Sequence, residues 1–353
     1  MSIFDQKVIK YEMKPLSSLE KVFPDETPVY RMECQMLSGL WGETVSFQVA
    51  YTGDFVMRER LDVRVVSELA EHVHVRTVEM VPVGRATNGI VDDNYLKTTS
   101  GLYPDLLKDL KDGKVIVYSR QWRSLWVDVD ITNEIPAGEY EIELQLIKEG
   151  EVVCSAKQKV TVIGTELPKL DIMHTEWMHA DCLADYYHVE VFSEEHWKLL
   201  ENYFQEYVKR DCNMMLTPLF TSPLDTAIGL ERTTCQLIDV EVKDGEYVFG
   251  FEKLKRWIDL CKKCGIEYFE MSHLFSQWGA KYAPKVVATV NGKKEKIFGW
   301  HTPAVGEYTK FLESFLPQLT AKLRKWEIAD VTYFHISDEP REEHLESYKA
   351  AKE

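Results

Sequence analysis

The sequence has no run of apolar residues long enough to span a bilayer, for which a helix needs about 20 residues. Its first residues, MSIFDQKVIKYEM, also lack the apolar core of a secretory signal peptide. The seven cysteines are odd in number and scattered, which is not the pattern of a disulfide framework. We therefore expect a protein of the reducing cytoplasm that does not bind a membrane.

Positive charge is also scarce. Lys and Arg number 42 against 58 Asp and Glu, which gives a formal net charge of -16. No basic block interrupts this excess, so a phosphate backbone or an anionic lipid surface would be repelled. The composition argues against nucleic acid as a partner and is compatible with a neutral substrate such as a sugar.

The sequence offers little for a metal ion or a redox centre. Residues 261–264 form a single CxxC pair in a helical stretch, with no second pair at zinc-finger spacing. His174, His179, Asp181 and His273 could meet at one edge of the fold, but their spacing matches no helical or knuckle ligand motif. We expect neither a metal nor a cofactor.

Residues 1 to about 165 contain short segments in which apolar and polar side chains alternate, as in antiparallel strands with one buried face. These segments are 44–51, 61–66, 126–131, 140–146 and 152–162. Several short strands separated by turn signals predict a β-sandwich domain over residues 1–165. The segment 95–110 breaks the alternation, and we expect a long loop or a short helix there.

Beyond the linker 164–169 the order changes to strand, loop and helix, repeated four times. We expect strands at 170–173, 212–217, 266–271 and 331–336, and helices at 193–209, 251–264, within 305–326 and at 342–352. Ser193 is a typical helix start, and Gly265 is a typical helix end. Units of this kind predict parallel strands joined by right-handed crossovers.

Two architectures are built from such units. An open doubly wound sheet usually carries a Gly-rich phosphate loop after its first strand, and none is present here. The long strand-to-helix loops, rich in aromatic residues, suit the catalytic face of a TIM-like (β/α) barrel. Because a closed barrel has eight units, we interpret residues 170–353 as the first half of a catalytic barrel and expect the chain to be truncated. Its open edge would promote self-association.

The fourth expected strand ends in two adjacent carboxylates. Asp338, Glu339 and Pro340 directly follow the apolar segment 331–336 and Ser337. The loops at this edge of a barrel build the active site, and glycoside hydrolysis commonly uses a pair of carboxyl groups. The alternative interpretation is a solvated helix start, with Asp338 as N-cap and Pro340 at the first helical position.

The element Ser337-Asp-Glu-Pro340 resembles a motif of glycoside hydrolase family 123. The likeness also rests on Trp126-Val-Asp-Val, Pro136-Ala-Gly-Glu-Tyr140, Thr175-Glu-Trp-Met-His179-Ala-Asp181 and Gly299-Trp300. It extends over the whole chain but reaches only the first half of the family's barrel. The resemblance implies a retaining β-N-acetylgalactosaminidase in which the 2-acetamido oxygen of the sugar is the nucleophile. It also implies that Glu339 is the acid/base residue and that Asp338 stabilises the acetamido group.

The loops after the earlier strands contain further candidates for binding the sugar. These are Glu176, Trp177, His179, Asp181, His273, Trp278 and Trp300. A tryptophan face suits the C–H face of a pyranose, and polar side chains suit its hydroxyl groups. Each also has a purely structural interpretation, as a solvated residue of a surface loop or as a packing residue. We expect His335 to be a core residue with satisfied hydrogen bonds.

Two other functions fit the same residues. The chain could be a non-catalytic carbohydrate-binding or scaffold protein that retains the fold, and half a barrel could be inactive by itself. It could also be a glycosidase that pairs Glu339 with a distant carboxylate in a two-carboxylate mechanism. The partner predicted in every case is a carbohydrate, and for the retaining β-N-acetylgalactosaminidase it is a β-N-acetylhexosaminide.

Overall fold

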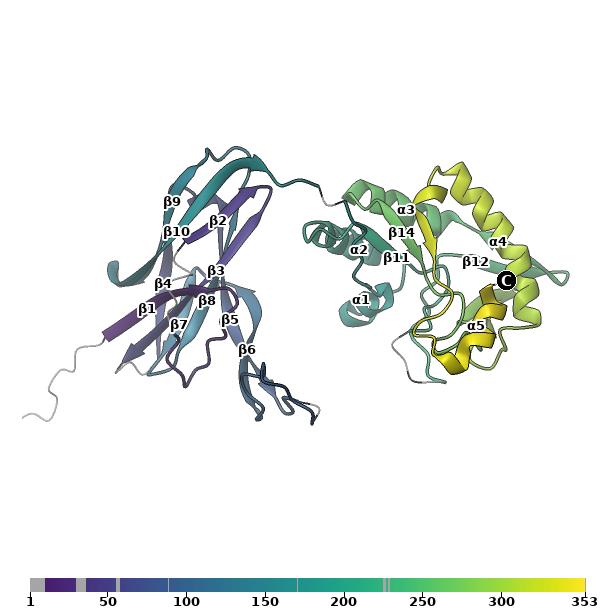
Figure 1. Ribbon diagram of the computed structural model, residues 1–353, viewed down its shortest axis with the longest axis horizontal. Coiled ribbons are helices and arrows are strands. Elements are labelled where there is room, and N and C mark those ends of the chain that lie inside the picture. Colours follow the sequence, from purple (N-terminus) through teal and green to yellow (C-terminus); the bar gives the residue numbers. More distant parts are fainter. Residues whose placement is uncertain are drawn as a thin grey trace, which may run out of the picture. The chain divides into compact units, whose positions relative to one another are not determined.

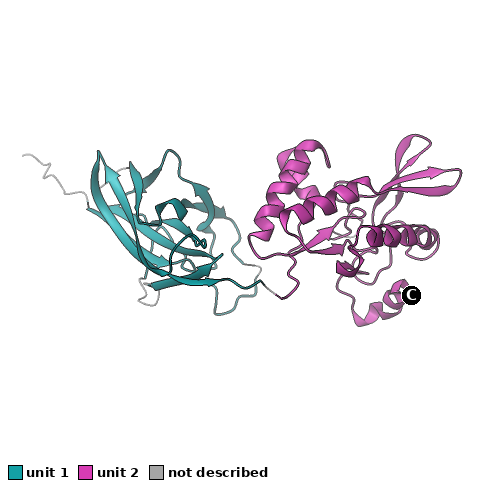
Figure 2. Cartoon of the chain, turned by 90° about the horizontal axis from the view of Figure 1, so that it is seen from above, with its two compact units in different colours: residues 1–169 teal, residues 170–353 magenta. Residues whose placement is uncertain are grey.

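The computed structural model describes residues 10–29, 36–54, 58–87, 89–169, 171–224, 227 and 229–352. The chain divides into two compact units, residues 1–169 and 170–353 (Figure 2). Cys34 and Leu170 lie outside the described residues. Among the described residues, no helix combines the length and the apolar character that crossing a bilayer would require.

Unit 1 contains two five-stranded sheets that share one core (Figure 1). The first has the order β1 (Lys10–Ser17), β3 (Thr44–Asp54), β8 (Arg123–Asp130), β5 (Val73–Val83) and β6 (Gly101–Asp109). The second has the order β2 (Met36–Trp41), β10 (Glu151–Glu166), β9 (Gly138–Lys148), β4 (Arg58–Val66) and β7 (Lys114–Tyr118). Neighbouring strands are antiparallel except β2 and β10, which are parallel. Strands occur at all five segments where alternation predicts them.

The expectation of a loop or helix at 95–110 is wrong for most of that segment, because β6 covers Gly101–Asp109. Pro104 interrupts the alternation in the sequence. It is tolerated because β6 lies at the edge of its sheet and pairs with β5 across a register shift between Val78 and Met80.

Unit 2 is built around three short parallel strands, β11 (Met214–Thr217), β14 (Tyr268–Met271) and β17 (Thr332–Phe334), in that order. Two hairpins, β12–β13 (Asp239–Lys243 and Glu246–Gly250) and β15–β16 (Val286–Val290 and Lys293–Phe298), follow β11 and β14 and join through parallel β12 and β15. Each hairpin is followed by a helix, α3 (Glu252–Cys264) or α4 (Glu307–Lys325). The remaining helices are α1 (Ala180–Tyr187), α2 (Glu194–Val208) and α5 (Leu345–Lys352).

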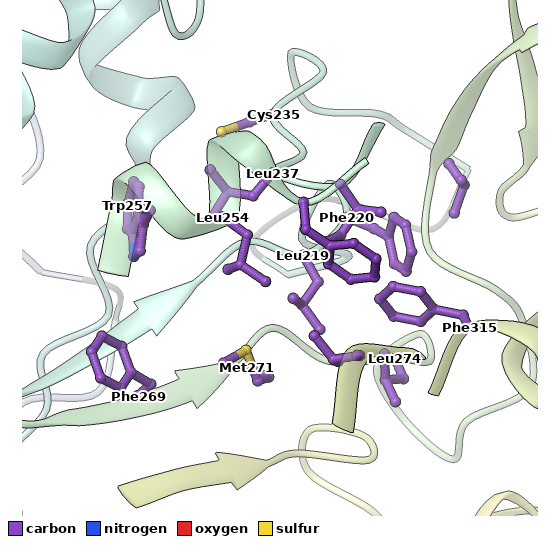
Figure 3. Packing of buried hydrophobic residues seen from close by; sticks show 14 of the residues in the cluster. Leu219, Phe220, Cys235, Leu237, Leu254, Trp257, Phe269, Met271, Leu274 and Phe315 are labelled. Carbon is purple, nitrogen blue, oxygen red and sulfur yellow. The ribbon is translucent and has the colours of Figure 1, made fainter. Parts of the chain in front are cut away.

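The core of unit 2 lies between the parallel sheet and its helices. Phe269 and Met271 of β14, Leu254 and Trp257 of α3 and Phe315 of α4 are buried in one apolar cluster (Figure 3). Along β14 these two apolar residues alternate with Tyr268 and Glu270. In a strand successive side chains point to opposite faces, so Glu270 lies on the face turned away from this core.

The predicted strand at 170–173 is wrong in the part that is described, since residues 171–173 form no strand. Side chains, instead of a ladder, hold the segment that follows. The Asn213 amide donates to the Ile172 carbonyl and accepts from the His174 N–H, both at 2.8 Å. The Tyr207 hydroxyl accepts from the Glu176 N–H at 2.8 Å and donates to the Met214 carbonyl at 2.6 Å. Three of these bonds join residues 31 to 41 positions apart in the sequence, and they satisfy backbone groups that a strand ladder would otherwise pair.

The prediction of about four βα units in a barrel is therefore corrected to three parallel strands. The described residues form an open sheet with β11 and β17 at its two edges, and they do not close a barrel. The predicted helices are present. Ser193 caps α2, its hydroxyl accepting from the His196 N–H at 3.3 Å, and Gly265 ends α3 with a φ of 103°.

Removing the cap of α2 tests how far this helix start stabilises unit 2. Ser193→Ala leaves the His196 N–H without its side-chain acceptor and should lower the free energy of unfolding by about 1 kcal/mol. Ser193→Asp supplies another acceptor and should retain the stability. Urea unfolding of both variants checks this, and equal losses in the two would contradict the capping role.

Candidate active site

Asp338 and Glu339 lie just beyond the carboxyl end of β17, four and five residues after Phe334. Asp338 is half-buried and Glu339 is exposed. Their backbone is fixed by the loop that follows β14, residues 276–280, which we call the 276–280 loop. The two loops come from neighbouring parallel strands, and this is why residues about 60 positions apart in the sequence meet here.

Ser337 is the centre of the connection between the two loops. Its buried hydroxyl donates to the Ser276 carbonyl at 2.9 Å and accepts from the Ala280 N–H at 3.2 Å. The Asp338 carbonyl accepts from the Trp278 N–H at 3.0 Å. Three hydrogen bonds therefore fix the backbone just before and at the carboxylate pair.

The same loops hold several residues in the left-handed region of φ. Trp278, Ala280 and Glu339 have φ values of 56°, 54° and 45°, and Gly279 lies at 105°. A Cβ at Gly279 would come within 2.7 Å of His344, so only glycine fits there. Non-glycine residues in this region cost free energy and persist where the surrounding structure holds them, often at functional sites.

Each carboxylate receives a hydrogen bond from the side chain of one of two adjacent residues. The Gln277 amide donates to Asp338 Oδ2 at 3.0 Å, and the Trp278 indole N–H donates to Glu339 Oε2 at 3.3 Å. Among the described residues, Asp338 Oδ1 and Glu339 Oε1 accept no hydrogen bond. Each carboxylate thus keeps one oxygen available to a substrate.

A polar cluster with a buried centre lies beside Asp338, and we call it the buried polar cluster. Glu270 and His273 at its centre are buried, His335 is half-buried and Trp177 is exposed. Glu270, 8% exposed, accepts from the Trp177 indole N–H at 3.0 Å and faces His335 Nδ1 at 3.1 Å. The rings of His273 and His335 are 4.0 Å apart between centroids, and Trp177 lies edge-on to His273 at 5.3 Å.

The cluster has perturbed proton affinities. Burial alone would raise the pKa of Glu270, but the hydrogen bonds from His335 and Trp177 outweigh it and lower that pKa. Burial, together with the nearby His335, lowers the pKa of His273 to about 4, against the smaller opposing effect of Asp338. His273 is therefore neutral and Glu270 is charged at neutral pH.

His273 has no hydrogen-bond partner among the residues that the structure describes. The side chain is 1% exposed, and neither ring nitrogen contacts a donor or acceptor in the described part of the chain. A buried polar group without a partner costs about 1–3 kcal/mol.

The other predicted binding residues lie in different surroundings. Asp181 forms a buried two-fold ion pair with Arg232, at 2.8 and 3.1 Å, so its carboxylate is already engaged. His179 precedes α1 and acts electrostatically on His273. Glu176 is exposed and lies 3.6 Å from the His174 ring. For these residues a role in sugar binding stays a prediction.

Trp278 and Trp300 line one pocket of about 460 Å³. We call it the aromatic pocket, and its walls include Gln277, Trp278, Lys281, Tyr282, Trp300 and Arg341. Asp338 and Glu339 do not themselves line it. Gln277 and Trp278, which donate to the two carboxylates, connect the pocket to them.

Sequence reasoning missed Glu270 and Gln277, and it treated His335 as a core residue. His335 is half-buried, and its ring contacts Glu270 rather than an apolar core. The signal that could have found the cluster was Glu270 itself, a carboxylate inside the apolar segment 266–271. In the described part of the chain, no group of three or more His, Cys, Asp or Glu side chains is arranged to hold a metal ion.

The chain was compared with protein families and solved structures. The model of the glycoside hydrolase 123 catalytic domain matches residues 177–353, half of the chain. The structure is similar to one described as giving the details of glycolipid glycan hydrolysis by a family 123 glycoside hydrolase from Clostridium perfringens. That match has a TM-score of 0.70 at 14% identity and covers 97% of this chain and 60% of the clostridial one. This chain therefore spans less than two thirds of the clostridial chain.

Other matches are weak. A β-glucosidase from Listeria innocua in complex with isofagomine has a TM-score of 0.21 at 10% identity and covers 45% of this chain and 17% of that one. The N-terminal domain of PorA has a TM-score of 0.22 at 10% identity, with 41% and 99% covered. Scores this low carry no argument. No curated protein sequence matches the chain.

The hydroxyl of Ser337 provides a test of what holds the two loops together. Ser337→Ala leaves the Ser276 carbonyl and the Ala280 N–H without their partner, which should destabilise unit 2 by about 1–3 kcal/mol. The Ala280 amide should also exchange its hydrogen faster. Ser100→Ala, at an exposed serine of unit 1, is the control. Unchanged exchange at Ala280 would contradict the role of Ser337.

His273 should make the stability of unit 2 depend on pH. Its pKa is lower in the folded than in the unfolded chain, so the unfolded chain binds more protons as the pH falls from about 6.5 to about 4. Stability should fall across that window, by about 3 kcal/mol at most. His273→Phe keeps a ring and removes the titrating group, so the stability of this variant should fall less than that of the parent across the same pH window.

Urea unfolding at pH 7 and pH 4.5 measures this difference between the variant and the parent. His301→Phe, at an exposed histidine of the same unit, is the control. Parallel pH dependences in the parent and the His273 variant would show that the buried ring does not contribute.

Proposed function

Because the chain belongs to glycoside hydrolase family 123, we propose that it acts in hydrolysing terminal β-linked N-acetylgalactosamine with retention of configuration. The observation that supports this most is the adjacent pair Asp338 and Glu339. Each is held by a donor from the 276–280 loop and keeps one free oxygen. The substrate class is also suggested by the clostridial enzyme, whose structure is described in terms of glycolipid glycan hydrolysis.

The proposed reaction is assisted by the substrate. The carbonyl oxygen of the 2-acetamido group attacks the anomeric carbon while the bond to the leaving oxygen breaks. Glu339 gives its proton to that oxygen, and a cyclic oxazolinium intermediate forms. Water then attacks the anomeric carbon, gives its proton to Glu339 and restores the acetamido group. The same residue is thus acid in the first step and base in the second.

Asp338 would accept a hydrogen bond from the acetamido N–H and stabilise the positive charge that develops on that group. Its half-buried position strengthens such an interaction relative to bulk water. Gln277 holds Asp338 Oδ2 and leaves Oδ1 for the substrate. We therefore assign Gln277 as a positioning residue.

The buried polar cluster is proposed to contact the terminal sugar. Trp177 is 38% exposed and could present a ring to the C–H face of the pyranose, while the buried His273 packs against Trp177 with 5.3 Å between ring centroids. We further propose that residues 170–353 correspond to the first half of a catalytic barrel, preceded by the sandwich domain of residues 1–165.

Two rival functions can be separated from this one by experiment. One is a carbohydrate-binding protein without catalysis, which would contact a sugar through the same aromatic side chains. The other is a two-carboxylate glycosidase, which needs a second carboxylate with an oxygen free to react. Glu270 is a buried carboxylate of this region, but both of its oxygens are occupied by Trp177 and His335.

The acid/base role of Glu339 is tested by Glu339→Gln in the complete gene product. With an N-acetyl-β-galactosaminide that has a poor leaving group, kcat/KM should fall by about 10²–10⁴-fold, because no proton reaches the leaving oxygen. With a nitrophenyl leaving group, which needs less protonation, the rate of the first step should fall less. Glu342→Gln, at an exposed neighbour, is the matched control.

Unchanged turnover in Glu339→Gln would eliminate this residue as the acid/base group. Calorimetry with N-acetylgalactosamine on the parent protein tests the non-catalytic function, which binding without hydrolysis would favour. A thiazoline inhibitor, which mimics the cyclic intermediate, tests the two-carboxylate mechanism. Hydrolysis that is insensitive to this inhibitor would favour that mechanism.

A further inference from the structure

The aromatic pocket adjoins Glu339, whereas the buried polar cluster adjoins Asp338. Trp278 lines the pocket and donates a hydrogen bond to Glu339. The charge of Asp338 acts electrostatically on His273 of the cluster. The proton of Glu339 goes to the leaving oxygen in the proposed reaction. The pocket beside Glu339 is then placed to receive the group that leaves.

Two cations of this pocket have no acidic partner. Across the described ranges, no carboxylate lies within ion-pairing distance of the Lys281 ammonium or the Arg341 guanidinium. Glu343 also lines the pocket, but its carboxylate lies 3.5 Å from His344. Both cationic side chains are exposed, unlike Arg232, the cation of a buried ion pair with Asp181 in the same unit.

This local charge contrasts with the whole protein. The chain has a formal net charge of -16, whereas the described lining of this pocket holds two cations, Lys281 and Arg341, against one carboxylate, Glu343. Such a site attracts an anion more strongly than the surrounding surface, and a concave surface concentrates the field.

The remaining walls suit a sugar rather than a bare ion. Trp300 and Tyr282 lie 6.1 Å apart between ring centroids. Trp300 is fixed because its indole N–H donates to the Leu230 carbonyl at 3.0 Å. The chain at Tyr282 is fixed by a backbone bridge to Pro303. The pocket volume of about 460 Å³ accommodates a monosaccharide.

We propose that the aromatic pocket binds the leaving-group side of the substrate and selects glycans with an anionic group near the cleaved bond, a carboxylate or a sulfate ester. Lys281 and Arg341 bind the anion, and Trp300 and Tyr282 contact the sugar that carries it. This inference rests on the proposed function, because it takes Glu339 as the acid that protonates the leaving oxygen.

The test compares three β-N-acetylgalactosaminides whose second sugar is neutral, carboxylated or sulfated. The parent protein should show a kcat/KM about tenfold higher for the anionic substrates, and salt should reduce this preference. In the double variant Lys281→Met and Arg341→Met, the ratio of anionic to neutral kcat/KM should fall to about one. Lys293→Met, at an exposed lysine of β16, should leave the ratio as in the parent.

The outcomes separate the two proposals. Hydrolysis with equal kcat/KM for neutral and anionic substrates, or a ratio unaffected by the double variant, overturns the anion selectivity and leaves the hydrolase assignment intact. A preference for only one of the two anions, lost in the double variant, supports the pocket and identifies which group is bound.

If no substrate is hydrolysed, calorimetry with the carboxylated and sulfated monosaccharides tests the pocket independently. Binding that is lost in the double variant supports the pocket, and absence of binding overturns it.

Discussion

The candidate site depends on the attachment of the 276–280 loop to the residues that follow β17. One buried hydroxyl, that of Ser337, bonds the loop at both of its ends, and the Trp278 N–H adds a bond to the Asp338 carbonyl. These bonds hold non-glycine residues in the left-handed region of φ. Without such bonds, the residues would adopt φ values of lower energy. Because Gln277 and Trp278 belong to this loop, the constraint that fixes the backbone also delivers the two donors to the carboxylates.

The carboxylate pair separates two environments of different chemistry. Next to Asp338 lies the buried polar cluster, in which a charged Glu270 orients Trp177 and His335, while burial keeps His273 neutral. Next to Glu339 lies the aromatic pocket, whose cations Lys281 and Arg341 form no ion pair within the described part of the chain. Both environments draw on the chain that follows β14, since His273 comes directly after this strand and Trp278 comes later in the same loop. The proposed substrate has a neutral terminal sugar on one side of the cleaved bond and an anionic leaving group on the other, and the two environments differ in the same sense.

Sequence patterns predicted the elements whose signals are local. Ser193 and Gly265 marked helix ends, and alternation marked the sandwich strands. The patterns failed where pairing decides the structure. Pro104 concealed an edge strand that a neighbour stabilises, and side-chain hydrogen bonds replaced the expected strand at 170–173. Asp338 and Glu339 were predicted as candidates because they follow an expected strand. Glu270 was missed because its partners lie 93 and 65 residues away in the sequence.

The proposed reaction does not require a carboxylate nucleophile from the protein, and this bears on the role of Glu270. A retaining enzyme with its own nucleophile needs a second carboxylate about 5 Å from the acid, with an oxygen free to attack. Glu270 has neither oxygen free, since one accepts from Trp177 and the other faces His335. If the acetamido group of the substrate is the nucleophile, no such residue is needed. A buried carboxylate can then serve to fix an indole and an imidazole, and its low pKa keeps it in the charged form that does so.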